Sequence, residues 1–199
     1  MIKIRKSVFE ANSSSIHSIA IPKSCEDYKK FLQTTIYFGF DDFGWEIESV
    51  NPANYLYTAI HAYYAGDKDS ITNWINILKE ELDKAGISYE FSKAVYGSYT
   101  WDGKEYSYLN SGNIDHPEDL GNLFEYFLNH RDKIVPFLLD GMVFTGNDNI
   151  SEDEEGSNDR DKEFIEVFHY NKGKSTIETI RNPYYEKEND NYDWIYKGN

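Results

Sequence analysis

Residues 52–86 read PANYLYTAIHAYYAGDKDSITNWINILKEELDKAG, and this stretch decides the helical part of the fold. Pro52 fits the first turn of a helix, because its missing N–H has no intrahelical partner there, and Gly66 is a typical helix end. The segment between them carries apolar residues at helical spacing, namely Leu56, Ala59, Ile60 and Tyr63. A first helix is therefore predicted from Pro52 to about Tyr64.

The second half of the stretch predicts another helix directly after the first. Asp69 or Ser70 caps its N-terminus, and Gly86 suits its C-terminal end. One apolar stripe runs along it, formed by Ile71, Trp74, Ile75, Leu78 and Leu82. Because an isolated amphipathic helix needs such a stripe to be buried, we expect a helical hairpin that packs on the core.

Short segments rich in β-branched and aromatic residues surround this helical hairpin and are typical of strands. We expect strands at 2–9, 17–21, 35–40, 87–95, 105–109, 142–145, 164–170 and 175–180. The dipeptide Asp102-Gly103 is a strong signal for a tight hairpin turn. It predicts that segments 87–95 and 105–109 pair with each other in the antiparallel sense.

Further helical segments are indicated at 26–33, from Pro117 onward and at 134–139. The helix from Pro117 has a predicted apolar face of Leu120, Leu123, Phe124, Phe127 and Leu128. Helices lie among strands without the regular alternation of a parallel sheet. We therefore predict one α+β domain over residues 1–199, with a mainly antiparallel sheet and about three to four helices packed on it. The tail at 182–199 is polar and aromatic, and we expect it to be partly ordered.

The composition is that of a folded chain. Hydrophobic residues make up 40% and aromatic residues 17% of the sequence, which excludes an intrinsically disordered protein. Most aromatic side chains come from 17 tyrosines and 12 phenylalanines. We expect most of these rings in the core, and a tyrosine-bearing surface that contacts partners is the alternative.

The charge is strongly negative and unevenly distributed. The formal net charge is -15, and residues 101–199 carry 22 acidic against 10 basic side chains. This imbalance argues against direct binding of nucleic acid, since such binding needs a basic patch that replaces counterions on phosphates. It favours basic partner proteins, including nucleic-acid enzymes with phosphate-binding channels. The alternative is that the acidity serves solubility alone.

The sequence also predicts a cellular compartment. Cys25 is the single cysteine and cannot form an internal disulfide. We find neither a secretory signal pattern nor an apolar run of about 18 residues, so we expect a cytoplasmic protein without membrane contact.

Candidate catalytic residues gather in the serine cluster that ends at His17. Ser15 and His17 are two residues apart on a predicted strand and so share a face, which allows contact between hydroxyl and imidazole. His116 and Asp148 are the other members of this hypothetical site, with Asp115 expected to cap the helix that follows. The alternative is a turn whose hydroxyl groups bind local backbone. Neither a metal-ligand spacing nor a cofactor motif accompanies these residues, so we predict no metal and no cofactor.

The loop at 146–163 is the most acidic segment. Its carboxylates at 152–155 are consecutive, and the EF-hand pattern for Ca²⁺ fails because Ile150 and Glu152 do not fit its ligand order. A solvated charge run is one interpretation. The other is a phosphate mimic that occupies the arginine and lysine contacts of a nucleic-acid-binding protein. The predicted partner-binding residues are Glu152, Asp153, Glu154, Glu155, Asp159 and Asp161.

Three segments carry a resemblance to a known family. They are Ile4-Arg5-Lys6 through the run Phe9-Glu10-Ala11-Asn12-Ser13-Ser14-Ser15-Ile16-His17-Ser18, then Ile114-Asp115-His116, and finally Thr145-Gly146-Asn147-Asp148-Asn149. Together they resemble a phage- or prophage-encoded family of low-GC Gram-positive bacteria that has no assigned activity. Ala11 stands where that family's motif usually has threonine. The resemblance implies a mobile-element context, and it assigns no function to any residue.

Two hypotheses of different classes follow. The first is a non-catalytic inhibitor, of anti-restriction or anti-CRISPR type, that binds a basic bacterial nuclease or another nucleic-acid enzyme through acidic and tyrosine side chains. The second is a small hydrolase or transferase that uses Ser15 and His17 with His116 and Asp148. The oligomeric state is left open by the sequence.

Overall fold

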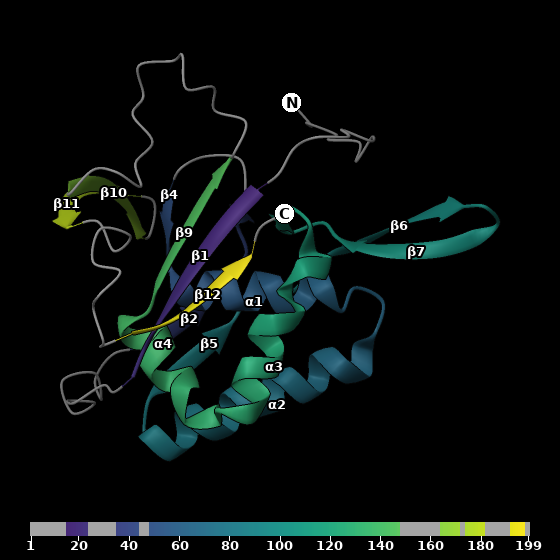
Figure 1. Ribbon diagram of the computed structural model, residues 1–199. Helices are drawn as coiled ribbons and strands as arrows, with labels where there is room; N and C mark the ends of the chain where they lie inside the picture. Colours follow the sequence, from purple (N-terminus) through teal and green to yellow (C-terminus); the bar gives the residue numbers. More distant parts are fainter. Residues whose placement is uncertain are drawn as a thin grey trace, which may run out of the picture.

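The computed structural model describes residues 15–23, 35–43, 48–147, 164–171, 174–181 and 192–197. Within them the chain has a mixed α+β fold, which confirms the predicted class (Figure 1). The helices are α1 (Pro52–Tyr63), α2 (Lys68–Ala85), α3 (Gly121–Asn129) and α4 (Ile134–Asp140), with 3-10 turns η2 (Pro117–Leu120) and η3 (Arg131–Lys133). The strands are β1 (Ser15–Pro22), β2 (Thr35–Phe38), β3 (Asp42–Phe43), β4 (Glu48–Val50), β5 (Ser88–Phe91), β6 (Tyr96–Trp101), β7 (Lys104–Leu109), β8 (Asn113–Ile114), β9 (Met142–Asn147), β10 (Phe164–Asn171), β11 (Lys174–Arg181) and β12 (Tyr192–Lys197).

The main sheet has four strands in the order β12-β1-β9-β4, and every neighbouring pair is antiparallel. Strand β1 is interior, so His17 lies between Thr145 of β9 and Lys197 of β12. Strand β12 belongs to the tail for which the sequence predicted only partial order. Its backbone is satisfied by pairing with β1, a partner that is remote in sequence and that local patterns do not reveal.

The remaining described strands form pairs. Strands β2 and β5 are parallel, as are β3 and β8, whereas β6–β7 and β10–β11 are antiparallel hairpins. The predicted pairing of 87–95 with 105–109 is therefore wrong. Helices α1 and α2 lie between β2 and β5 along the chain and supply the long crossover that a parallel pair requires.

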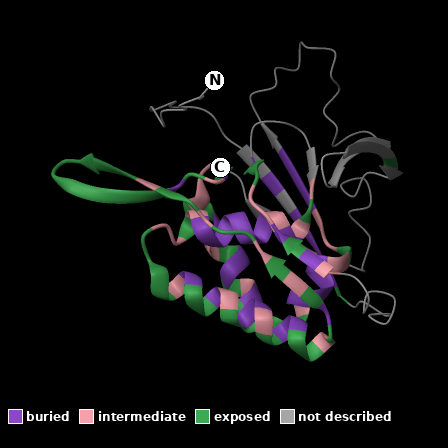
Figure 2. Cartoon of the chain, turned by 180° about the vertical axis from the view of Figure 1, so that it is seen from behind, coloured by how far each residue is buried: buried purple, intermediate pink, exposed green. Residues whose placement is uncertain are grey.

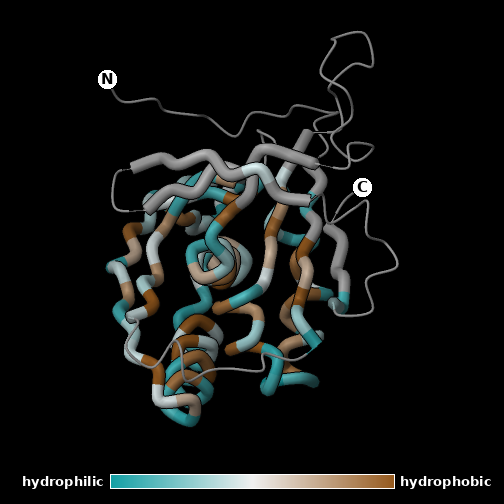
Figure 3. Tube along the Cα trace, turned by 90° about the vertical axis from the view of Figure 1, so that its left-hand side faces the viewer, coloured by the Kyte–Doolittle hydropathy of each residue, from teal (hydrophilic) through white to brown (hydrophobic). Residues whose placement is uncertain are grey.

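Helix α1 forms the centre of the core. The side chain of Asn51 accepts a hydrogen bond from the backbone N–H of Ala53 at 2.8 Å, which caps the helix ahead of Pro52. Its buried residues lie on nearly every side of the helix: Ala53, Tyr55, Leu56, Tyr57, Thr58, Ala59, Ile60 and His61. A helix that is apolar all round is a buried helix, and Figure 3 shows α1 almost end-on near the middle of the molecule.

Helix α2 begins and ends close to the predicted positions. Its cap is Asp67 rather than Asp69 or Ser70, because the Asp67 carboxylate accepts the Ser70 N–H at 3.1 Å. Gly86 ends the helix in the left-handed conformation, with φ of 71°. The buried stripe consists of Ile71, Trp74, Ile77, Leu78, Glu81 and Leu82. It matches the prediction except that Ile75 is only partly buried and Ile77 takes a core position.

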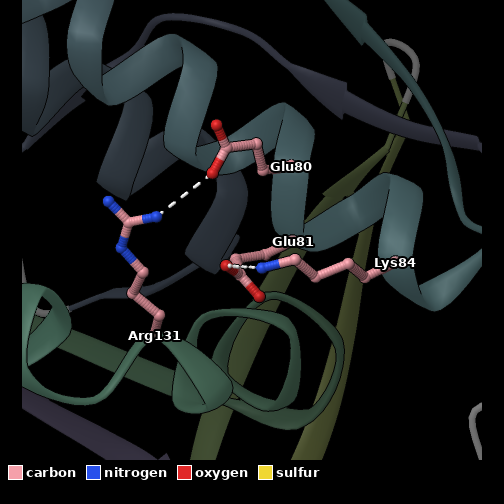
Figure 4. A network of polar contacts seen from close by, with 4 residues as sticks. All are labelled: Glu80, Glu81, Lys84 and Arg131. Atoms are coloured by element: carbon pink, nitrogen blue, oxygen red, sulfur yellow. Dashed lines mark hydrogen bonds and ion pairs between the residues drawn. The ribbon is translucent and has the colours of Figure 1, made fainter.

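Helix α2 makes two ion pairs, and one of them joins it to η3 between α3 and α4 (Figure 4). Arg131 contacts the carboxylate of Glu80 at 3.1 Å, and Lys84 contacts Glu81 at 2.7 Å within the helix. Because three of these four side chains are well exposed, each pair contributes at most about 1 kcal/mol. The packing of the helices therefore depends on their apolar faces.

Helices α3 and α4 cover the core on the side of α2 and β1. The predicted buried face of α3 is confirmed at Leu123, Phe124 and Phe127, whereas Leu128 is exposed. Pro136 lies in the first turn of α4, where its missing N–H has no intrahelical partner, so the helix runs through it. The hydroxyl of Tyr126 donates to Asp193 at 2.7 Å, which ties α3 to β12. None of the helices in the described part of the chain combines the length and the apolar character needed to cross a membrane.

Candidate functional site

His17 is a core residue. Its side chain is fully buried, and its Nδ1 lies 2.6 Å from the hydroxyl of Tyr55, which is also fully buried. The two rings meet edge to face, with centroids 5.5 Å apart. Burial raises the pKa of the Tyr55 phenol, so this hydroxyl stays protonated. The arrangement is a polar pair that satisfies two groups inside the core.

The hypothetical catalytic residues fall into different surroundings. Ser15 starts β1 and pairs with Asn147 of β9. His116 interacts instead with Glu118 at 3.2 Å and with Asp115 at 3.9 Å. Asp148 lies outside the described residues. His17 thus contacts Tyr55, whereas His116 contacts Glu118 and Asp115.

The expected cap at Asp115 is wrong. His116 occupies the N-cap position of η2 in the left-handed region, with φ of 47°, and no side chain caps this turn. Across the part of the chain that the structure describes, no three His, Cys, Asp or Glu side chains converge as metal ligands would.

The predicted partner-binding carboxylates lie outside the described residues. They are Glu152, Asp153, Glu154, Glu155, Asp159 and Asp161. The predicted start of the acidic loop at residue 146 is wrong, because Gly146 and Asn147 continue strand β9 opposite Ile16 and Ser15.

The hairpin β6–β7 is the feature that sequence analysis did not foresee as a site. Its turn was predicted: Asp102 and Gly103 have φ of 49° and 72°, the positive values that a two-residue type I′ turn requires. The hairpin projects beyond the helices (Figure 1), and almost all of it is exposed (Figure 2). A two-stranded ribbon is marginally stable alone, so its side-chain pairs matter for its structure.

The pairing register separates the hairpin into two faces of different chemistry. Gly97 lies opposite Tyr108, Tyr99 opposite Tyr106, and Trp101 opposite Lys104. These residues share one face, which we call the aromatic face, because side chains alternate along a strand. The other face is built from small polar residues along most of its length, with the pairs Tyr96 and Leu109, Ser98 and Ser107, and Thr100 and Glu105.

The aromatic face exposes four large rings. The exposed fractions are 49% for Tyr99, 59% for Trp101, 40% for Tyr106 and 44% for Tyr108. Tyr99 stacks on Tyr106 across the strands with centroids 5.4 Å apart and planes 18° from parallel. Tyr108 lies across Gly97, where an added Cβ would come within 2.4 Å of its ring. Gly97 thus gives Tyr108 room to lie flat on the ribbon.

The opposite face meets the body of the molecule at the base of the hairpin. The Tyr96 hydroxyl is 2.5 Å from Nδ1 of His61 on α1, and Leu109 is buried. Ser107 lies beside Gly66 in the α1–α2 turn, close enough that an added Cβ on that glycine would contact it at 3.5 Å. These contacts leave the aromatic face turned away from α1.

His61 sits in an aromatic setting beneath the hairpin. Phe40, Tyr57 and Tyr96 surround its ring, with centroids between 4.5 and 6.0 Å away. Burial lowers its pKa to about 4, so the imidazole is neutral at pH 7. The hydroxyl of Tyr57 donates to the backbone carbonyl of Ser92 at 2.7 Å, directly after β5. Helix α1 therefore contacts the base of the hairpin through His61 and the preceding segment through Tyr57.

A comparison with models of protein families, with curated proteins and with solved structures found no match to this chain. The candidate site therefore rests on the geometry of the chain itself. The sequence predicted a tyrosine-bearing contact surface only as an alternative to burial of most rings in the core, and it did not locate that surface on the hairpin. The signal is visible in retrospect: aromatic residues at alternate positions, Tyr99 with Trp101 and Tyr106 with Tyr108, flank the Asp102-Gly103 turn.

Proposed function

We propose that this protein is a non-catalytic binding protein that captures a basic protein partner, with the aromatic face of the β6–β7 hairpin as its contact surface. One observation carries the proposal: four large aromatic side chains lie together and exposed on a projecting ribbon. Tyr and Trp are enriched at the energetic centres of protein interfaces, because they bury large area with few rotatable bonds. A soluble protein rarely exposes such a group of rings without a partner.

The charge supports a basic partner. The net charge of -15 steers positively charged proteins toward the molecule over long range, in a manner that salt screens. Within the hairpin, Asp102 and Glu105 are acidic and Lys104 is basic. Nucleic-acid enzymes are basic along their substrate channels, so inhibition of such an enzyme is the function we propose for this capture.

The hydrolase hypothesis has less support. A catalytic histidine must reach both substrate and nucleophile, whereas His17 is fully buried and bonded to Tyr55. Its place between the main sheet and α1 is that of a core residue.

The test is a cleavage assay with purified bacterial nucleases, both restriction enzymes and RNA-guided nucleases. We expect at least one nuclease to lose DNA cleavage at a near-stoichiometric amount of this protein. The inhibition should weaken as ionic strength rises, because steering is electrostatic. The variant Tyr99→Ser/Trp101→Ser/Tyr106→Ser should lose inhibition by about tenfold or more, as expected for the centre of an interface.

The matched control is Ser98→Ala/Thr100→Ala, which alters the opposite face of the same strand and should inhibit as well as the native chain. Inhibition that is equal in both variants would remove the hairpin from the proposal. A parallel series from Glu to Gln and Asp to Asn at 152–155 measures the contribution of the acidic loop. If none of the nucleases is bound or inhibited, the proposed function is wrong.

A further inference from the structure

The chemistry of the aromatic face indicates what kind of segment it binds, an inference that rests on the proposed function. We propose that the face receives an extended segment of the partner with arginine at alternate positions, whose guanidinium groups stack on Tyr99, Trp101, Tyr106 and Tyr108. The occupant is thus a basic strand-like stretch of protein.

The geometry of the ribbon supports an extended occupant. The β6–β7 pair forms a sheet of two strands, and within the described residues neither outer edge is paired with another strand. Such an edge presents backbone N–H and C=O groups that an added strand can use. Alternate side chains of an extended strand are about 6.6 to 6.8 Å apart, and the rings follow the same spacing because they also occupy alternate positions. A strand bound along this edge would therefore place one side chain beside each cross-strand pair of the aromatic face.

The rings favour arginine over other side chains. The guanidinium group is planar and weakly hydrated, and it stacks on aromatic faces, whereas the lysine ammonium is compact and strongly hydrated. Tyr99 and Tyr106 form a stacked pair, with planes 18° from parallel, so each ring keeps one outer face on which a planar cation can stack. The carboxylate of Asp102 belongs to the turn at the tip of the ribbon, which fits a cationic occupant.

Lys104 is the one group of the aromatic face that opposes this occupant. It lies opposite Trp101 in the register, next to the turn. A positive charge there repels arginine at the tip and selects where along the ribbon the segment binds. We therefore expect removal of the Lys104 charge to strengthen binding of a basic segment. If the face bound an acidic partner, the same change would weaken binding.

The experiment uses the full chain and synthetic peptides of ten residues that alternate arginine and threonine, with lysine and threonine peptides for comparison. Binding is measured by calorimetry at low and at physiological salt. We expect the arginine peptide to bind about fivefold more tightly than the lysine peptide. Trp101→Leu keeps apolar bulk but removes the π face, and it should weaken the arginine peptide by about threefold. Lys104→Ala should strengthen binding by about twofold.

Ser107→Ala, on the opposite face, is the matched control and should bind the arginine peptide unchanged. Equal affinity for both peptides, or no effect of Trp101→Leu, would overturn the inference and leave only general charge attraction. Tighter binding of an oligothymidylate than of the arginine peptide, lost in Trp101→Leu, would also overturn it in favour of single-stranded nucleic acid. Self-association through the hairpin, seen by sedimentation and abolished by Trp101→Leu, would assign the face to a second copy instead.

The two proposals fail separately. Nuclease inhibition that depends on the aromatic face, without preference for the arginine peptide, would overturn this inference while the proposed function stands. Preference for the arginine peptide without inhibition of any nuclease would support this inference and reject the proposed function.

Discussion

Two regions of this protein are rich in aromatic side chains, and their environments are opposite. Around α1, the rings of Tyr55, Tyr57 and Trp74 are buried by helices and strands on every side. On the β6–β7 hairpin, Tyr99, Trp101 and their cross-strand neighbours remain exposed because no described layer covers the ribbon. Composition therefore predicts that aromatic side chains need to be buried. The topology determines which of these rings are buried within the chain and which stay exposed for contact with another molecule.

Removal of one tryptophan from each region tests the difference between the buried and the exposed rings, and it has the largest expected effect. Trp74→Ala should lower the free energy of unfolding by about 3 to 5 kcal/mol, since it opens a cavity against Phe124. Trp101→Ala should lower it by less than about 0.5 kcal/mol, because the ring is mostly in water already. Urea unfolding followed by circular dichroism measures both. Similar losses would mean that the hairpin is part of the core.

The second prediction concerns His61, which connects α1 to the base of the hairpin through its contact with Tyr96. Its pKa is about 4 in the folded chain, whereas the unfolded chain has the ordinary value of about 6.5. Between these values the unfolded state binds more protons, so the free energy of unfolding should fall as the pH drops from about 6.5 to about 4. The loss reaches up to about 3 kcal/mol, and above about pH 6.5 His61 contributes no pH dependence. Subtracting the pH profile of His61→Gln isolates this effect, and identical profiles would refute it.

A smaller effect is expected for the buried polar pair. Tyr55→Phe keeps the ring but removes the hydroxyl that contacts His17 at 2.6 Å. Loss of this buried hydrogen bond should cost about 1 to 2 kcal/mol of unfolding free energy. Tyr106→Phe makes the same chemical change on the exposed hairpin and should cost less than about 0.5 kcal/mol. Chemical unfolding of both variants measures the two losses of unfolding free energy. Equal losses would contradict the prediction.

The smallest predicted effect lies within the hairpin. A double-mutant cycle that replaces Tyr99 and Tyr106 by alanine should give a coupling free energy of about 0.5 to 1 kcal/mol, because the rings are stacked across the strands. Hydrogen exchange of the hairpin amides is the measurement, since the hairpin opens without the core. The pair Ser98 and Ser107, opposite each other on the other face, should show a coupling near zero. Equal coupling in both pairs would show that the rings do not organise the ribbon.

Much of the helical structure could be predicted from the sequence because its signals are local. Pro52 and Gly86 mark helix ends within one or two residues, and the apolar stripe of α2 follows from its spacing. The cap at Asp67 was missed because Asp67, Asp69 and Ser70 compete as caps, and only the geometry shows which carboxylate accepts a backbone N–H.

Strand pairing was predicted less well because it depends on remote partners. The turn at Asp102-Gly103 was correct, yet the strand before it was assigned to 87–95 instead of β6. Residues Tyr96–Trp101 read YGSYTW, which does not alternate strictly between rings and small residues and so is a weak pattern for a strand. The segment 87–95 contains β5, which pairs with β2 across two helices, and no local rule finds such a pairing.

The sequence predicted the kinds of side chain that form the candidate site but not their arrangement. The excess of tyrosine and the acidic charge were evident, while the convergence of four rings on one face follows from a register that only the folded hairpin defines. The serine and histidine cluster attracted a catalytic interpretation because His17 is polar. Its burial beside Tyr55 depends on β1 lying inside the sheet, which again is a matter of long-range pairing.

The position of β1 between β9 and β12 also bears on how the protein is made. About 170 residues separate Pro22 from Tyr192, so β1 leaves the ribosome long before its outer neighbour. At a synthesis rate of about 5 to 20 residues per second, one edge of β1 waits roughly 10 to 35 seconds for β12. During that interval an apolar strand edge is open to other nascent chains. We therefore expect this sheet order to make folding during synthesis sensitive to translation speed.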